Sequence, residues 1–152
     1  MIDLICVGSA RGALREASSD YEDRLARVCR FRLREVREER LDQTTTAEAL
    51  ERERRRIEPM LAGARVVALD RGGRQLGSEE LAAFVREREE LPPQHTAFVI
   101  GGPRGLSPDL LERCDLRLSL GAPTLPHQLA RVVLLEQIYR AFTIIRGEPY
   151  HL

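Results

Sequence analysis

Lysine is absent from this chain, and its three cysteines form no CxxC pair. Cys6, Cys29 and Cys114 are odd in number and widely spaced, which argues against a disulfide framework and against a zinc site. We expect all three to be small core or strand residues, and we expect no metal. No stretch approaches the roughly 20 apolar residues that cross a bilayer, and the first residues carry no basic leader. The sequence therefore predicts a cytoplasmic protein with no membrane segment.

Net charge is also absent, because 24 basic residues balance 24 acidic ones. A nucleic-acid-binding protein usually carries a basic surface, so charge alone argues against RNA and DNA partners. Every basic residue is arginine, however, and guanidinium groups bind phosphate in a bidentate manner and stack on bases better than ammonium groups do. A compositional bias of the genome explains the same fact. The arginine content therefore keeps RNA open as a partner, and we expect no DNA.

The length of 152 residues and a hydrophobic content of 43% fit one globular domain, residues 1–152. Hydrophobic periodicity and turn residues predict an alternation of strands and helices. The expected strands are Ile2–Val7, Phe31–Val36, 66–69, Thr96–Ile100 and 116–120, and the expected helices are 13–29, one opening at Thr45, one capped by Ser78, one opened by Ser107-Pro108, and 128–145. This order predicts an α/β fold with a mostly parallel sheet flanked by helices.

Three of these elements carry more detailed expectations. Thr45-x-x-Glu48 resembles a capping box, and the inner face of its helix is expected at Ala47, Leu50, Arg54, Ile57 and Leu61. The run ERERRR at 51–56 resembles an RNA-binding patch, but its interleaved glutamates favour a solvated face with local ion pairs. The third strand is expected to end at Asp70 and a Gly72-Gly73 turn. The helix at Ser78 should bury Leu81, Ala82 and Val85.

Two glycine- and proline-bearing loops follow apolar strands in the last third of the chain. Open parallel sheets bind ligands at the carboxyl ends of their strands, where Leu69, Gly101 and Leu120 are expected. The loop GGPRG at 101–105 matches neither GxGxxG nor GxxxxGK[ST], so a dinucleotide or triphosphate site is poorly supported. Its glycines suit either a tight turn or a ligand lying against the main chain. The loop at 121–126 offers backbone amides and one hydroxyl without charge, which suits a neutral ring such as adenine.

The final helix is apolar around its whole circumference, at Leu129, Val132, Val133, Leu134, Leu135, Ile138, Tyr139 and Phe142. Such a helix is buried on more than one side. We expect a homodimer built partly on this helix, the alternative being burial inside one sheet–helix sandwich. Glu136 and Arg140 are four residues apart and suit an ion pair. His127 and the end of the chain, Tyr150-His151, fit no Ser-His-Asp or HExxH pattern.

Taken together, these blocks resemble the small SPOUT-class methyltransferases that methylate N3 of a pseudouridine in the decoding-centre stem-loop of bacterial 23S rRNA. The resemblance covers essentially the whole chain, and it is carried by the opening strand with Gly8 and by VVALD, FVIGGPRGLSP, LSLGAPTLPHQLARVVLLEQIYRAF and RGEPYHL. It implies a C-terminal deep trefoil knot, S-adenosylmethionine as cofactor, and a site completed across a homodimer. Cofactor contacts carried over from the family fall on Leu69, Gly101, Leu120, Gly121, Ala122, Pro123, Thr124 and Leu125.

The resemblance also implies a mechanism, in which a ring nitrogen attacks the cofactor's methyl carbon in line and loses its proton. The target base has to be turned out of its stack and held by stacking and edge contacts. Candidate catalytic residues are His151, Tyr150, Glu136 and Arg140, with His151 or Glu136 favoured as the base. Candidate RNA contacts are His127, Arg131, Arg140, Tyr150 and His151.

The expected acceptor is 23S rRNA within the assembled ribosome, because a composite surface lessens the need for a basic protein. One alternative is a SPOUT enzyme with another RNA acceptor, although this chain has no room for an additional RNA-binding domain. Another is a ribosome-binding module that has the fold without catalysis. A nucleotide-dependent enzyme lacks the phosphate-loop spacing.

Overall fold

The computed structural model describes residues 1–40, 42 and 44–152, with the backbone alone of His151. Over this part of the chain, five parallel strands form one sheet in the order β2-β1-β4-β3-β5. The strands are β1 (Ile2–Val7), β2 (Phe31–Val36), β3 (Arg65–Gln75), β4 (Thr96–Ile100) and β5 (Leu116–Ser119). No described helix is both long and apolar enough to cross a membrane. The expected α/β fold with a parallel sheet is confirmed.

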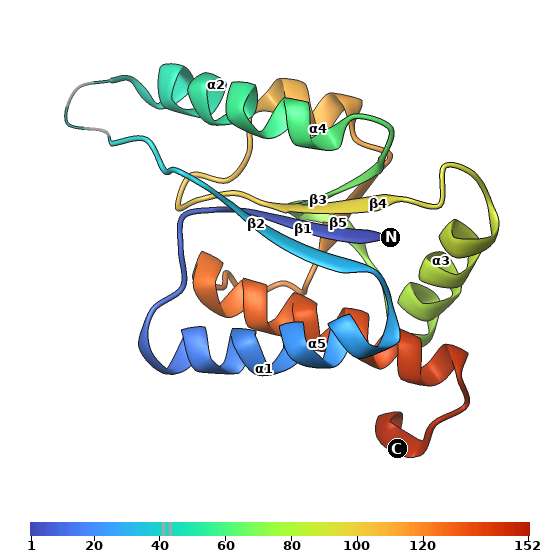
Figure 1. Ribbon diagram of the computed structural model, residues 1–152. Helices are drawn as coiled ribbons and strands as arrows, with labels where there is room; N and C mark the ends of the chain where they lie inside the picture. Colours follow the sequence, from blue (N-terminus) through green and yellow to red (C-terminus); the bar gives the residue numbers. More distant parts are fainter. Residues whose placement is uncertain (41, 43) are drawn as a thin grey trace.

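Helices cover both faces of this sheet (Figure 1). The helices are α1 (Gly12–Val28), α2 (Thr46–Ile57), the short η1 (Glu58–Leu61), α3 (Ser78–Glu90), α4 (Pro108–Arg113), α5 (His127–Ile145) and η2 (Pro149–His151). Helices α1 and α5 lie on one face and α2 and α4 on the other, whereas α3 packs beside α5. Each face therefore has its own hydrophobic core, one around Phe98 and Leu134 and the other around Val99 and Ile57.

Local sequence signals place most elements within one residue. Strands β1, β2 and β4 have the predicted bounds, and α1 and α5 each begin one residue earlier than predicted. The capping box at Thr45 is present, with the Thr45 Oγ1 accepting from the Glu48 amide at 3.2 Å. The helix α3 buries Leu81, Ala82 and Val85 as expected, although its N-cap is Gly77.

The predicted inner face of α2 is confirmed at Ile57, and Leu61 packs against the same core, but it is wrong at Ala47 and Arg54. Ala47 is exposed and Arg54 half-buried, while the buried residues are Ala49, Glu53 and Ile57. Glu53 lies on the buried face because its carboxylate accepts a hydrogen bond from the Glu39 amide at 2.9 Å. This bond joins α2 to the segment after β2. The expectation of local ion pairs for 51–56 is confirmed, since Glu51 and Glu58 pair with Arg54 and Glu51 also pairs with Arg55.

Strand β3 also differs from the prediction, because it continues past Asp70 to Gln75. Its pairing with β5 shifts between Leu69 and Arg74, since both residues face Leu118 and the four residues between them bulge out of the ladder. Gly73 lies so close to β5 that a Cβ would come within 2.7 Å of the Arg117 backbone. The two glycines therefore serve a bulge inside a strand and not a turn after it.

Cys6 is a core strand residue, as expected, whereas Cys29 and Cys114 are the C-cap residues of α1 and α4 and pack against the cores. Cys6 is buried in β1, and Cys29 and Cys114 are half-buried, all three as free thiols. Burial raises the pKa of the Cys6 thiol to about 12 and that of Cys29 to about 11, so both stay protonated at neutral pH.

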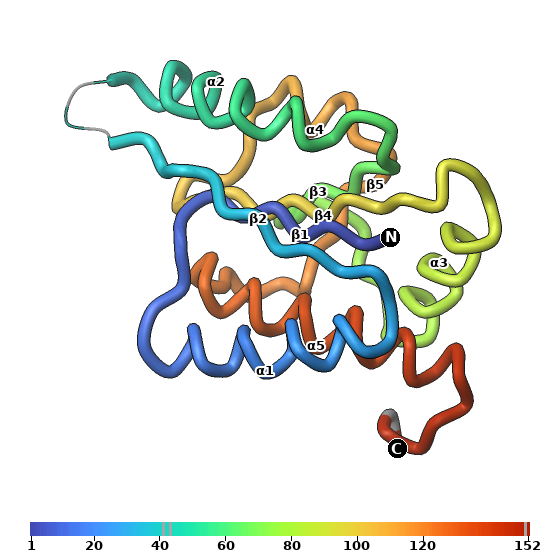
Figure 2. Tube along the Cα trace, in the orientation of Figure 1, coloured from blue at the N-terminus to red at the C-terminus, as the bar shows by residue number. Residues whose placement is uncertain are grey.

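The chain returns from the edge of the sheet to its middle through residues 120–126. These residues leave β5 at the edge and reach α5, whose first residues lie beside the end of β1. There, Gln128 Oε1 accepts from the Arg11 amide at 3.0 Å. Since β3 and β4 lie between β5 and β1, the segment passes across the carboxyl ends of both strands, and Figure 2 shows it descending from the upper to the lower layer.

The opposite end of the sheet is held by a buried carboxylate. Asp3 is fully buried and accepts from Arg32 Nε at 2.9 Å and Nη2 at 2.8 Å, with Arg34 Nη2 at 3.4 Å and His95 Nε2 at 3.2 Å. Burial raises the pKa of Asp3, but the hydrogen bond and charge of Arg32, the charge of Arg34 and the His95 contact outweigh it and lower the pKa below its usual 3.8. The ionised carboxylate thus joins β1, β2 and the start of β4.

We expect Asp3→Asn to lower the free energy of unfolding at pH 7 by about 2 kcal/mol, because it leaves two guanidinium groups without their anion. The cost stays at the low end of the range for buried pairs because Arg32 is half exposed and water screens part of the attraction. Urea unfolding of the wild type and the variant measures this difference in the free energy of unfolding. Asp20→Asn is the control, because it removes only an exposed pair with Arg24.

The same cluster predicts a pH dependence. Since folding lowers the Asp3 pKa, its stabilisation is present above about pH 4 and is lost as the pH falls through the lowered value. The wild type should therefore lose more stability than Asp3→Asn between pH 5 and about pH 2. Parallel curves for the two proteins over this range would contradict the assignment.

Candidate active site

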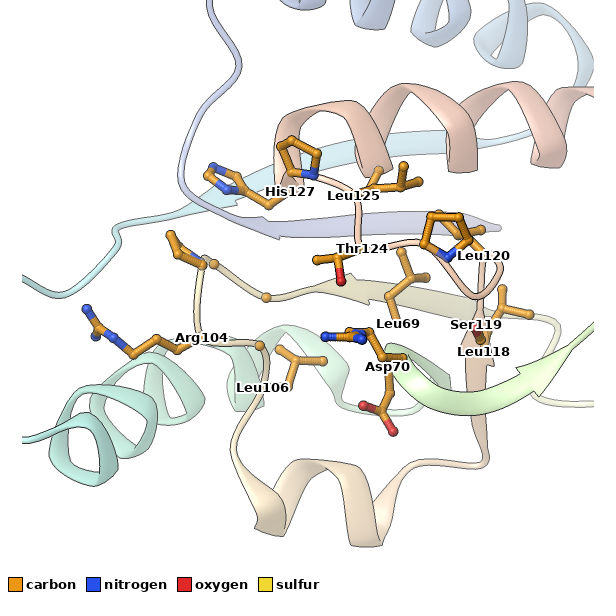
Figure 3. A pocket seen from close by; sticks show the side chains of 18 of the residues that line it. Leu69, Asp70, Arg104, Leu106, Leu118, Ser119, Leu120, Thr124, Leu125 and His127 are labelled. Carbon is orange, nitrogen blue, oxygen red and sulfur yellow. The ribbon is translucent and has the colours of Figure 1, made fainter.

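A cavity of about 820 Å³ opens at the carboxyl ends of β3, β4 and β5 (Figure 3). Its walls are the bulge of β3, the loop after β4, the segment 120–126 and the start of α5. The lining residues are Leu69, Asp70, Arg71, Gly101, Gly102, Pro103, Arg104, Gly105, Leu106, Leu118, Ser119, Leu120, Gly121, Pro123, Thr124, Leu125, Pro126, His127 and Ala130. The volume is in the range of small-molecule sites, and the position is where open parallel sheets bind ligands.

The residues expected at the cofactor site lie around this one cavity. Every one of them lines it except Ala122, which is exposed on the outer side of its loop. The parallel arrangement of the strands brings these residues together, because segments at the carboxyl ends of parallel strands meet at the same edge of a sheet. Sequence reasoning missed Asp70 and Arg71, which enter the lining through the bulge.

The loop after β4 is a tight turn that brings main chain to the cavity wall. Gly102 and Gly105 form a bridge, with the Gly105 amide donating to the Gly102 carbonyl at 3.0 Å. A Cβ on Gly101 would lie 2.3 Å from the Gly105 carbonyl oxygen, so no side chain fits there. The structure therefore supports the tight-turn interpretation of GGPRG, and the turn itself requires glycine at position 101.

The second loop presents polar groups that the protein leaves free. Among the described residues, the amides of Ala122, Thr124 and Leu125 donate no hydrogen bond within the chain. The Thr124 hydroxyl points into the cavity in Figure 3. Gly121 has a φ of 133°, and its amide donates to Ser119 Oγ at 3.2 Å, which fixes the start of the loop. Free main-chain donors between leucine side chains suit a flat heterocycle with ring-nitrogen acceptors.

At the start of α5, two predicted RNA-contacting residues differ in position. His127 lines the cavity and lies against Gly8, whose Cβ would come within 3.3 Å of Nε2. Arg131 is buried instead, with 1% exposure, and its Nη1 and Nη2 donate to Glu35 Oε1 at 2.7 Å and to the Gly8 carbonyl at 3.0 Å. The structure therefore does not support RNA contact by Arg131, because its guanidinium group is bonded inside the protomer.

The C-terminal residues form a second cluster, away from the cavity. The Tyr150 hydroxyl lies 3.4 Å from both the Tyr21 hydroxyl and Glu136 Oε1, and its ring packs edge-on against Tyr139 at 5.0 Å. Glu136 Oε1 also accepts from Arg140 Nη2 at 2.5 Å, which confirms the expected pair. The side chain of His151 lies outside the described residues. Tyr21 joins this cluster from α1, and no local pattern pointed to it.

The two clusters are separated along α5. Glu136 is nine residues beyond His127, which corresponds to about 13 Å along the axis at a rise of 1.5 Å per residue. Figure 1 shows the C-terminus beyond the far end of α5 from the segment 120–126. Within one protomer, the structure does not bring Tyr150, Glu136 and Arg140 to the cavity.

Comparison with known proteins identifies the family. A family model described as a predicted SPOUT methyltransferase matches residues 1–151. The ribosomal RNA large subunit methyltransferase H of Rubrobacter xylanophilus is 51% identical, over 97% of this chain and 96% of that protein. The protein of the same name from Syntrophotalea carbinolica is 46% identical, over 99% and 97%. The chain belongs to the SPOUT methyltransferase family.

A solved structure supports the SPOUT fold. A probable methyltransferase from Bordetella pertussis Tohama I superposes with a TM-score of 0.61 over 93% of this chain and 95% of that one, at 18% identity. Membership implies the C-terminal trefoil knot and S-adenosylmethionine as the cofactor, as the resemblance predicted. No group of described residues could hold a metal ion.

The cavity fits S-adenosylmethionine on two grounds. Its leucine-rich walls and unbonded loop amides suit adenine, and its volume of about 820 Å³ is large enough for a nucleoside with an amino-acid chain. Asp70 adds an anionic side chain to the lining, which suits a cofactor that carries a positively charged sulfonium and ammonium group.

We expect Gly101→Ala to abolish S-adenosylmethionine binding in calorimetry, because a methyl group at this position forces the Gly105 carbonyl out of the turn. Gly77→Ala is the control, since its φ of −67° suits alanine and the new Cβ meets only Glu80 Oε2 at 3.5 Å. The control should bind as the wild type does. Wild-type affinity in the folded Gly101→Ala variant would show that the turn does not form the site.

Proposed function

We propose that this chain is an S-adenosylmethionine-dependent methyltransferase that modifies N3 of a pseudouridine in the decoding-centre stem-loop of 23S rRNA. The observation that carries the proposal is the cavity between the two glycine loops, in a chain that matches proteins named ribosomal RNA large subunit methyltransferase H over nearly its whole length. Action on ribosomes places the protein in the cytoplasm.

The residues of the cavity have a binding and positioning role. When bound, S-adenosylmethionine supplies the methyl group, which passes from its sulfur to N3 while N3 loses its imide proton. Leu69, Leu120 and Leu125 would enclose the cofactor, and the amides of Thr124 and Leu125 would bind its base. Gly101 and Gly121 allow the main chain to approach. Rigid placement is the main requirement, because methyl transfer depends on in-line contact between the two reacting atoms.

We propose that a homodimer completes the site. The C-terminal cluster lies too far from its own cavity to act there, but a second copy packed against α5 can bring its Tyr150 and His151 to the mouth. The half-buried Leu129, Val132 and Val133 at the start of α5 provide apolar surface for such contact. Each dimer then has two sites, each built from both protomers.

The contacts of the C-terminal cluster separate the roles of its residues. Burial, the Tyr21 hydroxyl and the negative charge of Glu136 hold the pKa of Tyr150 well above its usual range, against the opposing charge of Arg140, so the phenol stays protonated and acts as a donor. Glu136 already accepts hydrogen bonds from Arg140 and Gln137, so it anchors these groups. This leaves His151 as the proposed proton acceptor for N3, and His127 and Arg140 as RNA contacts.

The acceptor can be tested directly. Purified protein should transfer a labelled methyl group to assembled ribosomes and much more slowly to naked 23S rRNA, because a neutral protein needs a composite surface for recognition. Mass mapping should find one added methyl at one pseudouridine. Equal rates on both acceptors would overturn the preference for ribosomes. A protein that failed to bind S-adenosylmethionine at millimolar concentration would instead be a binding module without catalysis.

Mixed dimers test the shared site. Gly101→Ala removes the cavity and His151→Ala removes the proposed base, so each homodimer should be inactive. Random pairing of the two variants restores one intact site in half of the dimers, which predicts about a quarter of the wild-type rate. Native mass spectrometry verifies the mixing. No recovery in verified mixed dimers would place both residues in the same protomer's site.

A further inference from the structure

The arginine side chains divide into paired and unpaired groups according to their place in the fold. Most of the arginines have a carboxylate oxygen within 4.0 Å, chiefly on helix surfaces and at the amino end of the sheet. Of the described arginines without such a partner, five lie at the carboxyl edge of the sheet, either after a strand or in the bulge of β3. They are Arg11 after β1, Arg37 and Arg40 after β2, Arg71 in the bulge of β3, and Arg104 after β4.

Local structure presents these side chains outward around the cavity. Arg104 is at the tip of the Gly102–Gly105 turn, and Figure 3 shows it pointing away from the cavity interior. Arg71 lies on the bulge that forms the opposite wall, and it is exposed. The Arg11 amide is bonded to Gln128 at the start of α5, while its side chain is exposed. Arg71 and Arg104 line the cavity, and Arg11, Arg37 and Arg40 follow the neighbouring strands β1 and β2 at the same edge of the sheet.

We infer that Arg11, Arg37, Arg40, Arg71 and Arg104 form a phosphate-binding rim that holds the RNA around the target nucleotide. This inference rests on the proposed function and deepens it, because it assigns the acceptor contacts to a set of residues outside the C-terminal cluster. Guanidinium groups bind phosphate oxygens in a bidentate manner, and contacts to phosphate fix the register of a nucleic acid without reading its sequence.

Acidic side chains on the same edge limit the kind of binding. Glu38 and Asp42 have no ion-pair partner among the described residues, and they line an open hollow with Glu39, Arg40 and Arg104. The rim is therefore a set of separate donors and not a uniformly positive surface. We expect short-range phosphate contacts with weak long-range attraction, which agrees with a net charge of zero.

The test removes three charges from the rim in the triple variant Arg11→Gln, Arg37→Gln, Arg104→Gln. The matched control is Arg27→Gln, Arg30→Gln, Arg86→Gln, which removes three exposed and equally unpaired arginines remote from the cavity. Methyl transfer to ribosomes is measured at several salt concentrations. We expect the rim variant to raise KM on the order of tenfold and to reduce the salt slope of log KM by about one per lost phosphate contact. The control should leave both unchanged.

Further measurements separate the possible failures. S-adenosylmethionine affinity should be unchanged in the rim variant, because the side chain of Arg104 points outward. Equal KM and salt slope in rim and control variants, with an active wild type, would overturn the rim and leave the proposed function standing. An inactive wild type that binds the cofactor would overturn the proposed function instead. Binding of the isolated stem-loop RNA should weaken with KM, and unchanged RNA binding would mean that the arginines contact ribosomal protein, which also overturns the inference.

Discussion

The buried guanidinium group of Arg131 is the contact on which the geometry of the active site depends. It joins α5 to the Gly8 carbonyl at the end of β1 and to Glu35 on β2. This contact fixes where α5 begins, and with it the far end of the segment 120–126 that crosses β3 and β4. Burial of an arginine is costly, and the carboxylate and carbonyl partners offset that cost. This bridge therefore fixes the position of the cavity wall that the start of α5 forms.

That arrangement also divides the protomer into two parts. The start of α5 belongs to the cavity, and its later half carries Glu136, Arg140 and the contacts of Tyr150. Because a straight helix cannot bring its two ends together, a single protomer holds the proposed cofactor and the proposed base apart. The symmetric pairing proposed above would bring the two together, with the same residues used twice.

Much of the fold follows from local rules, and the exceptions share one physical cause. The bounds of β1 and the capping box at Thr45 depend on neighbouring residues, so the sequence predicts them. The bulge of β3 depends on the approach of Gly73 to the Arg117 backbone, and the inner face of α2 depends on the Glu39 amide that bonds Glu53. Contacts between distant residues decided each of these features, and no window of sequence contains them.

The candidate site was predicted to a similar extent. Residues that follow parallel strands meet at one edge, so the cavity lining could be expected from Leu69, Gly101 and Leu120. Arg131 could not be placed correctly, because its residue type suits phosphate as well as a buried carboxylate. Tyr21 could not be assigned to the C-terminal cluster from the sequence, because its partner Tyr150 is 129 residues away.

Ion pairing explains how a chain with equal numbers of acids and bases can still present cations at one edge. The two charged groups of a salt bridge are bonded to each other and are less available to a ligand. The unpaired groups therefore remain to bind it. Here Arg54 and Arg55 of α2 form local pairs with Glu51, while Arg71 and Arg104 have no carboxylate oxygen within 4.0 Å among the described residues. Net charge therefore says little about RNA binding in a protein whose charged residues are mostly paired on helices.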